Sequence, residues 1–346
     1  MENIYTSRVH GFPGNWTASL VGNGWATTST VLSRGVAVMM PQEGLLSLVA
    51  VLGSSLSLVA LVFAFITYSL FSDLRSVSGT TLMNLLAALF MTQLLYVVGV
   101  GGIQDTELCV SLSFSLQYLH LTVFAWVTAL SHDLCRTLRR NVHVEPPPTE
   151  RAVGAVFACY SLLCWGTPLA LLAAAYLHRL QPPPQPTPTD NHFLKQYNCW
   201  FLEKDIQLLY YLLPVAILLL MQLYWLAKGA ALTRDAPSLQ MEPRRREKVK
   251  RRRRMQIVLY LKIIALLTAV CISGAVASFT GWNAAWIIFN IGHSVQGITV
   301  ALTVTCNCRI IGLYARSIKR RQKTLLAVSR SNNTQIISWS PVPDTV

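Results

Sequence analysis

Hydrophobic positions along this chain fall into seven long runs that are separated by shorter polar segments. Each run reaches the roughly 20 residues that an α-helix needs to cross the hydrocarbon core of a bilayer. The pattern therefore predicts an all-α membrane protein, a seven-transmembrane helix bundle. We place the spans at about 44–71, 79–102, 107–135, 152–177, 206–228, 256–280 and 284–308.

Positive charge lies almost entirely in one set of alternate connecting segments. Of the 29 Lys and Arg residues, 23 fall after the first, third, fifth and seventh spans, and 5 fall in the other set. Cytosolic segments carry an excess of Lys and Arg, so we predict the N-terminus outside and the C-terminus in the cytosol. Seven helices in this orientation are the topology of receptors.

The spans divide the chain into a bundle, 44–308, and two terminal segments. Residues 1–43 form the predicted extracellular segment, in which Asn15 begins a glycosylation sequon. This segment lacks the usual form of a signal peptide. Either the first span acts as its own signal anchor, or coding sequence precedes Met1. Residues 309–346 are predicted as a short amphipathic helix on the inner membrane face, up to about Lys323, followed by a disordered cytosolic tail.

The eight cysteines are too few and too scattered for a disulfide scaffold. Cys109 lies at the outer end of the third span and Cys199 in the second outer loop. No other cysteine falls on the predicted oxidising side, so we predict that these two pair. Cys306 and Cys308 follow the seventh span on the cytosolic side, where they are either palmitoylated or unmodified interfacial residues.

Composition narrows the function classes. Only 13% of the residues are charged, whereas a soluble domain carries about 25%. The net charge of +14 does not indicate nucleic-acid binding, because the basic residues lie beside membrane spans and attract anionic lipids of the inner leaflet. The chain has no phosphate-binding glycine loop, HExxH or GxSxG, and its histidines do not cluster at metal spacing. We predict no enzyme, no cofactor and no metal site.

Polar residues inside the spans gather on the third and seventh. His120 and His293 lie deepest. Asn290, His293, Ser294 and Gly297 follow i, i+3, i+4, i+7 spacing, which predicts one helix face turned into the bundle. Their side chains are then expected to bond across helices, either as structural links or as part of a binding site.

Charged residues gather where the third span ends, at Asp133, Arg136, Arg139 and Arg140. Such a cluster is either a solvated helix end or a surface that a cytosolic partner contacts. The basic run 244–254 before the sixth span has the same two interpretations, lipid contact or partner contact. The terminal Asp344-Thr345-Val346 is a short pattern that a PDZ groove can bind.

Several short motifs resemble those of secretin- and adhesion-type G-protein-coupled receptors. Cys199-Trp200 resembles their outer-loop Cys-Trp, and Ser294-Val295-Gln296-Gly297 looks like the adhesion-type Ser-x-Gln-Gly of helix 7. Cys164-Trp165-Gly166-Thr167-Pro168 is similar to the helix-4 Gly-Trp-Gly-x-Pro, where the small residue permits close helix packing. The end of the third span, with Asp133 and Arg136, most resembles Methuselah-like receptors. The resemblance covers roughly residues 44–322.

The resemblance implies a plasma-membrane receptor that transmits the binding of an unknown extracellular ligand to a heterotrimeric G protein. The ligand-side candidates are Trp200, His120, Asn290, His293 and Gln296. The G-protein-side candidates are Asp133, Arg136, Arg139, Arg140, Arg251 and Arg252. Two departures stand out: 43 residues cannot hold the large extracellular domain of such receptors, and Cys271 occupies the helix-6 position where the family usually has Trp.

Two other classes remain open from the sequence. A seven-helix transporter or channel would need a polar, water-lined path, and the near absence of acidic residues deep in the spans argues against one. A membrane scaffold derived from a receptor, without ligand recognition, would explain both departures. Constitutive G-protein activation would separate a receptor from a scaffold.

Overall fold

The computed structural model describes residues 42–71, 76–100, 106–143, 149–180, 204–235 and 243–305, with isolated helical positions at 318, 319 and 322. Several predictions concern residues outside these ranges: the sequon at Asn15, the loop with Cys199 and Trp200, and Cys306 and Cys308. Most of the predicted amphipathic helix and the whole C-terminal tail also lie outside the described residues.

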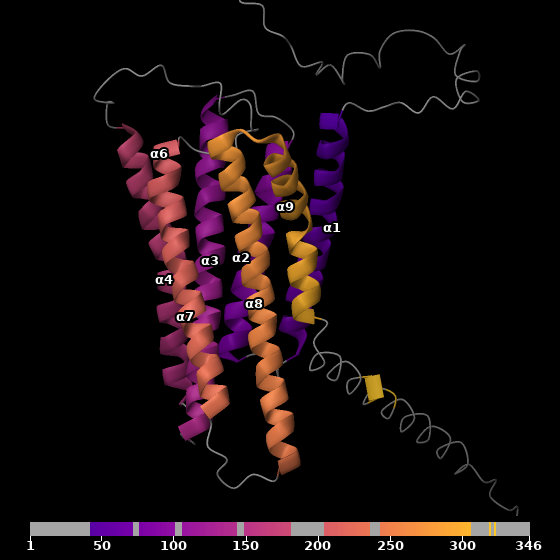
Figure 1. Cartoon of the computed structure of the whole chain (residues 1–346), viewed down its shortest axis with the longest axis vertical. Helices are drawn as coiled ribbons and strands as arrows, with labels where there is room; N and C mark the ends of the chain where they lie inside the picture. The colour runs from indigo at the N-terminus through magenta and orange to yellow at the C-terminus, as the bar shows by residue number, and fades with distance from the viewer. Residues whose placement is uncertain are drawn as a thin grey trace, which may run out of the picture. The chain divides into compact units, whose positions relative to one another are not determined.

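Helices account for the bundle, and seven of them are long and apolar enough to cross a membrane. The seven-transmembrane fold predicted from the hydrophobic pattern is therefore confirmed (Figure 1). In chain order the elements are α1 (Gln42–Leu70), α2 (Val77–Val100), α3 (Thr106–His143), α4 (Glu150–Leu180), α6 (Lys204–Gln207), the π-helical turn η2 (Leu208–Leu212), α7 (Leu213–Asp235), α8 (Pro243–Thr280) and α9 (Asn283–Thr305).

Two helices run well beyond the spans expected from hydropathy. α3 continues to His143 and α8 begins at Pro243, so each is 38 residues long. The added turns are rich in Arg and Lys, which are good helix formers although they cannot enter the hydrocarbon core. Proline suits the first turn of a helix, where its missing N–H is not needed. Hydropathy marks the part of a helix that lies in lipid and not the whole helix.

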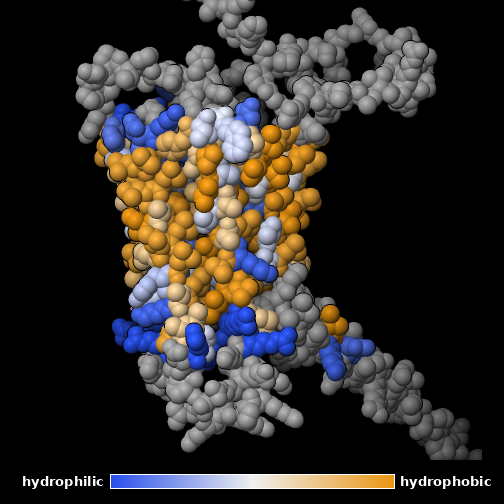
Figure 2. Space-filling view, viewed as in Figure 1, coloured by the Kyte–Doolittle hydropathy of each residue, from blue (hydrophilic) through white to orange (hydrophobic). Residues whose placement is uncertain are grey.

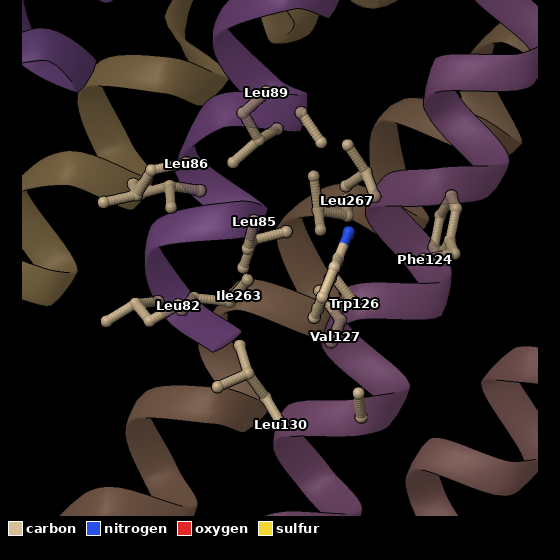
Figure 3. Packing of buried hydrophobic residues seen from close by; sticks show 14 of the residues in the cluster. Leu82, Leu85, Leu86, Leu89, Phe124, Trp126, Val127, Leu130, Ile263 and Leu267 are labelled. Carbon is tan, nitrogen blue, oxygen red and sulfur yellow. The ribbon is translucent and has the colours of Figure 1, made fainter. Parts of the chain in front are cut away.

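The third helix lies at the centre of the bundle, where it contacts α2, α4 and α7. In its most apolar stretch 67% of the residues are buried, against 17% in α4. Leu85 of α2, Val127 of α3 and Leu267 of α8 belong to one packed cluster (Figure 3). On the outside, hydrophobic side chains cover the middle of the viewed face and hydrophilic ones gather toward its two ends (Figure 2). This is the pattern of a membrane-embedded bundle.

A π-helical turn joins α6 to α7. The N–H of Leu213 bonds the carbonyl of Leu208, five residues earlier, in place of the α-helical partner four residues earlier. Pro214 follows directly and has no N–H to donate to the carbonyl of Tyr210, so regular α-helical bonding is interrupted here. Turns of this kind occur often at functional sites.

Small residues allow α1 and α9 to approach closely. A Cβ added to Gly297 would lie 2.7 Å from the Cβ of Ser57, and one added to Gly53 would lie 2.9 Å from the Oγ of Ser294. The Ser57 hydroxyl donates to the carbonyl of Ser294 at 2.5 Å and accepts from the N–H of Ile298 at 3.2 Å. The contact is therefore both tightly packed and hydrogen-bonded, as is common between membrane helices.

The corresponding expectation for helix 4 is wrong. Gly166 was expected to permit close helix packing, but it is exposed, and an added Cβ would meet nothing within 4 Å. Within the described part of the chain, α4 packs through Tyr160, Cys164, Pro168 and Ala175. These residues follow helical spacing on a different face, so the glycine faces away from the bundle.

Candidate functional site

A cavity with apolar walls and several polar side chains lies inside the bundle between α2, α3, α6, η2, α8 and α9. Its volume is about 40 Å³, which holds roughly three water molecules. None of the described lining residues is Asp, Glu, Lys or Arg. The lining consists of Tyr96, Ser113, Leu116, Gln117, His120, Gln207, Tyr211, Cys271, Gly274, Ala275, Phe289 and His293.

The cavity belongs to one half of the bundle. On α3 its lining residues lie within about 20 Å of the helix start at Thr106, at 1.5 Å per residue. On α9 they lie still closer to the start at Asn283, and Gln207 follows soon after the start of α6. These helix ends all belong to the side of the membrane that the charge pattern predicts to be extracellular.

Two histidines meet inside this cavity. The Nε2 atoms of His120 and His293 are 3.1 Å apart, so one of them donates a proton to the other. Which of the two rings donates depends on their tautomers. Nδ1 of His293 is buried without a hydrogen-bond partner among the described residues.

Tyr96 ties α9 to α2 behind the histidines. Its ring stacks on that of His293 with 4.0 Å between centroids, and its hydroxyl donates to Oδ1 of Asn290 at 2.8 Å. The Asn290 amide donates in turn to the carbonyl of Trp286 at 2.8 Å. Gln93 adds a bond of 2.6 Å from its Nε2 to the carbonyl of His293. The ring of His293 is therefore held by several contacts.

Gln117 has a buried side-chain amide whose hydrogen bonds are not completed by the described residues. Its side chain is only 7% exposed, and neither its Nε2 nor its Oε1 has a hydrogen-bond partner within the described structure. A buried polar group without a partner costs about 1–3 kcal/mol. Together with Nδ1 of His293, the amide gives three buried polar atoms whose hydrogen bonds water or a bound molecule can complete.

The opposite wall of the cavity joins η2 and α6 to α8. The hydroxyl of Ser278 donates to Oε1 of Gln207 at 2.5 Å. The Tyr211 hydroxyl and the Cys271 sulfur are 3.5 Å apart. Cys271 thus lines the cavity and contacts the π-helical turn.

Of the predicted ligand-side residues, the structure brings His120 and His293 into the cavity and places Asn290 directly behind them. Gln296 is also buried, but it does not line the cavity, and its Nε2 has no partner within the described ranges. Trp200 lies outside the described residues. The sequence reasoning missed several lining residues, among them the polar Tyr96, Gln117, Gln207 and Tyr211. Glutamine inside an apolar span was the available signal.

At the other end of α3, Asp133 is buried, and the charges of Arg136 and Arg140 act on it. The charge of Arg136 also acts on the hydroxyl of Tyr160 on α4. Arg139 is exposed and does not join this group. On α8, Arg251 is exposed, and the side chain of Arg252 lies outside the described part. The predicted G-protein-side residues thus divide into a group around the buried Asp133, with Arg136 and Arg140 half-buried, and the exposed Arg139 and Arg251.

Cys109 is disulfide-bonded and buried near the start of α3. Its predicted partner, Cys199, lies outside the described residues, so the pairing itself stays a prediction. The described free thiols are those of Cys135, Cys159, Cys164 and Cys271.

A family model, "7 transmembrane receptor (Secretin family)", matches residues 43–300. The chain belongs to this family. Two similar proteins are the mouse (Mus musculus) cadherin EGF LAG seven-pass G-type receptor 1, 31% identical over 121 residues, and the human (Homo sapiens) adhesion G protein-coupled receptor E3, 30% identical over 137 residues. The matches cover 35% and 40% of this chain but only 4% and 21% of those receptors.

The comparisons confirm the secretin- and adhesion-type resemblance that the motifs carried. The narrower similarity to Methuselah-like receptors stays a prediction. Together with the seven spans, family membership identifies a multi-pass membrane protein of a receptor family.

Proposed function

We propose that this protein is a plasma-membrane G-protein-coupled receptor that binds an extracellular ligand at the bundle cavity and passes the signal to a heterotrimeric G protein at the opposite end. The observation that carries this is the unpaired Gln117 amide and His293 nitrogen inside a cavity of one bundle half. Buried groups of this kind are suited to a ligand that brings the missing hydrogen bonds.

Two features support an extracellular cavity and a cytosolic C-terminus. The basic residues favour this orientation through the positive-inside rule. Independently, the disulfide of Cys109 lies at the cavity end of α3, and disulfides persist in oxidising compartments. The ligand chemistry follows from the lining, which presents amide, hydroxyl and imidazole groups and no fixed charge among its described residues. An uncharged polar group is the expected point of recognition.

Signal transfer requires two bundle arrangements that the ligand binds unequally. The cavity contacts α8 through Cys271, Gly274 and Ala275. The bonds Ser278–Gln207 and Tyr211–Cys271 hold α8 against α6 and η2 in the described arrangement. A ligand that competes for these groups would release α8, whose other end carries the basic run 244–254. Movement there would open a site for the G protein beside Arg136.

The basic run also supports contact with anionic lipids of the inner leaflet. The C-terminal sequence pattern supports a PDZ-domain protein as a further partner.

The first experiment measures ligand-free G-protein activation in cells as a function of surface expression, across a panel of Gα subunits. Ser278→Ala removes the bond to Gln207 and is expected to raise this basal signal severalfold. Ser273→Ala is the matched control, because within the described residues the Ser273 hydroxyl donates only to the carbonyl of Val270 on its own helix. Equal signals from both variants would contradict a restraining role for Ser278.

A second variant tests the transducer end. Replacing Arg251 to Arg254 with Ala should weaken coupling, because these residues continue α8 toward the predicted cytosol. Unchanged coupling at equal surface expression would remove the basic run from the G-protein site. Absence of activation with every Gα subunit, in the native chain and in Ser278→Ala, would overturn the proposed function in favour of a scaffold.

A further inference from the structure

A cluster of aromatic and cationic side chains lies away from the cavity, where α3, α4 and α7 meet near the opposite end of the bundle. We call it the α7 patch and define it by Tyr224, Trp225 and Lys228 of α7 with His132 of α3 and Tyr160 of α4. The Trp225 and His132 rings meet edge to face with 4.6 Å between centroids. Nδ1 of His132 and the Tyr160 hydroxyl are hydrogen-bonded at 2.6 Å.

Lys228 is fixed above two rings of the α7 patch. Its Nζ lies 5.5 Å from the ring centroids of both Tyr224 and Trp225 and donates to the Tyr224 hydroxyl at 3.3 Å. The side chain remains exposed. A cation held over two aromatic faces has lost much of its freedom while keeping access to the outside.

A second cation comes close to the same point from α3. Gly229, next to Lys228, packs against α3, where an added Cβ would lie 4.0 Å from the Cα of Cys135, and Arg139 stands one helical turn after Cys135. The charges of Lys228 and Arg139 both act on the Cys135 thiol. Arg139 is exposed as well. Asp133, the nearby acid, interacts with Arg136 and Arg140 instead. Within the described ranges, neither Lys228 nor Arg139 forms an ion pair with an acidic side chain.

The depth of the α7 patch in the membrane determines which kind of anion can reach Lys228. The α7 span extends to Arg234, so Lys228 and the two rings lie close to its end, at the level where aromatic residues line a membrane interface. Ile217, Leu220 and Met221 lie one to two turns before Tyr224, on the bilayer side, and are exposed. The surface therefore presents cations and aromatic rings at the membrane interface and apolar side chains next to them in the bilayer. A molecule with an anionic head and apolar chains fits this arrangement.

We propose that Lys228 and Arg139, supported by the rings of Tyr224 and Trp225, bind the phosphate-bearing headgroup of an anionic phospholipid from the surrounding leaflet. Tyr160 and His132 are positioning residues, because their hydrogen bond holds the imidazole against Trp225. The site needs only membrane insertion and does not depend on ligand binding or on G-protein coupling. It is also separate from the basic run on α8.

The test uses the full chain, purified and titrated with phosphatidylserine or with phosphatidylcholine of the same acyl chains, with bound lipid counted by native mass spectrometry. Lys228→Gln with Arg139→Gln removes both cations. The matched control is Arg234→Gln with Arg151→Gln, which removes two exposed charges near the same end of the bundle. Lys228→Arg keeps the charge and serves as the rescue variant.

We expect the double variant to lose about fivefold in phosphatidylserine affinity for each charge removed, with phosphatidylcholine binding unchanged. The control pair and Lys228→Arg should stay within twofold of the native chain, and millimolar inorganic phosphate should not displace the lipid. An equal loss in the control pair would reduce the effect to general attraction by the leaflet and overturn the site. So would an unchanged affinity in Lys228→Gln alone and in the double variant.

Discussion

Replacing Gly297 with Ala should destabilise the bundle through the contact between α1 and α9. The added Cβ would lie 2.7 Å from the Cβ of Ser57 and 3.0 Å from Cδ1 of Leu61. The Ser57 Cβ cannot rotate away, because it is fixed to the backbone, so the helices must separate. Overpacking of this kind costs about 1–3 kcal/mol. Separation also weakens the two hydrogen bonds of the Ser57 hydroxyl, at about 0.6 kcal/mol each in membrane helices.

The sum is about 2–4 kcal/mol, which corresponds to a melting temperature lower by about 3–6 °C for a chain of this size. The assay follows thermal unfolding of the purified protein with a thiol-reactive fluorescent dye. Cys135 and Cys164 are free and buried, so unfolding exposes them to the dye.

Gly166→Ala is the matched control for this substitution. It makes the same chemical change within another membrane helix, but the new Cβ meets nothing within 4 Å. Alanine has the higher helix propensity by about 1 kcal/mol, so the melting temperature should stay the same or rise slightly. Equal melting temperatures for both alanine variants would refute the argument. Ser57→Gly combined with Gly297→Ala should recover part of the loss, since it removes the clashing Cβ.

Two further predictions concern the cavity. Tyr96→Phe removes the hydroxyl that donates to Asn290 at 2.8 Å but keeps the stacked ring, so it should cost about 0.6–2 kcal/mol and lower the melting temperature by a few degrees in the same dye assay. A larger loss than for Tyr96→Ala would contradict this. Gln117→Leu removes two unpaired buried atoms, so it should stabilise the ligand-free protein by about 1–3 kcal/mol. A lower melting temperature would show that the amide is satisfied.

The hydrophobic pattern was sufficient to predict the seven spans, because the requirement for apolar residues in lipid is imposed on each helix separately. The same is true of the inward face of α9, where Asn290, His293, Ser294 and Gly297 are all buried as their spacing predicts. The spans follow from the apolar environment of the lipid, and the inward face of α9 follows from the helical period. Neither prediction needs to know which helices are neighbours.

These patterns could not predict which helices pack against one another. Gly166 and Gly297 both lie in apolar helices next to motifs of the family, yet one faces away from the bundle and the other lies against Ser57. Gln117 likewise becomes important only because α3 turns it into a cavity that α8 and α9 complete. A residue's role in such cases depends on which helix lies opposite, and that depends on the packing of all seven.

The contacts of α9 indicate which part of the bundle is free to move. On one side it is fixed to α1 by the Gly297–Ser57 contact and to α2 by Tyr96 and Gln93. Toward α8, Gly292 faces Val270, where an added Cβ would lie 3.0 Å from a methyl group, and among the described residues no hydrogen bond crosses this contact. Apolar surfaces without directional bonds can slide at low cost. α8 is also linked to α2 away from the cavity, where the hydroxyls of Tyr260 and Ser78 lie 3.4 Å apart. At the cavity wall, the bonds that restrain α8 are those to α6 and η2, and these are the bonds that a ligand there would contact first.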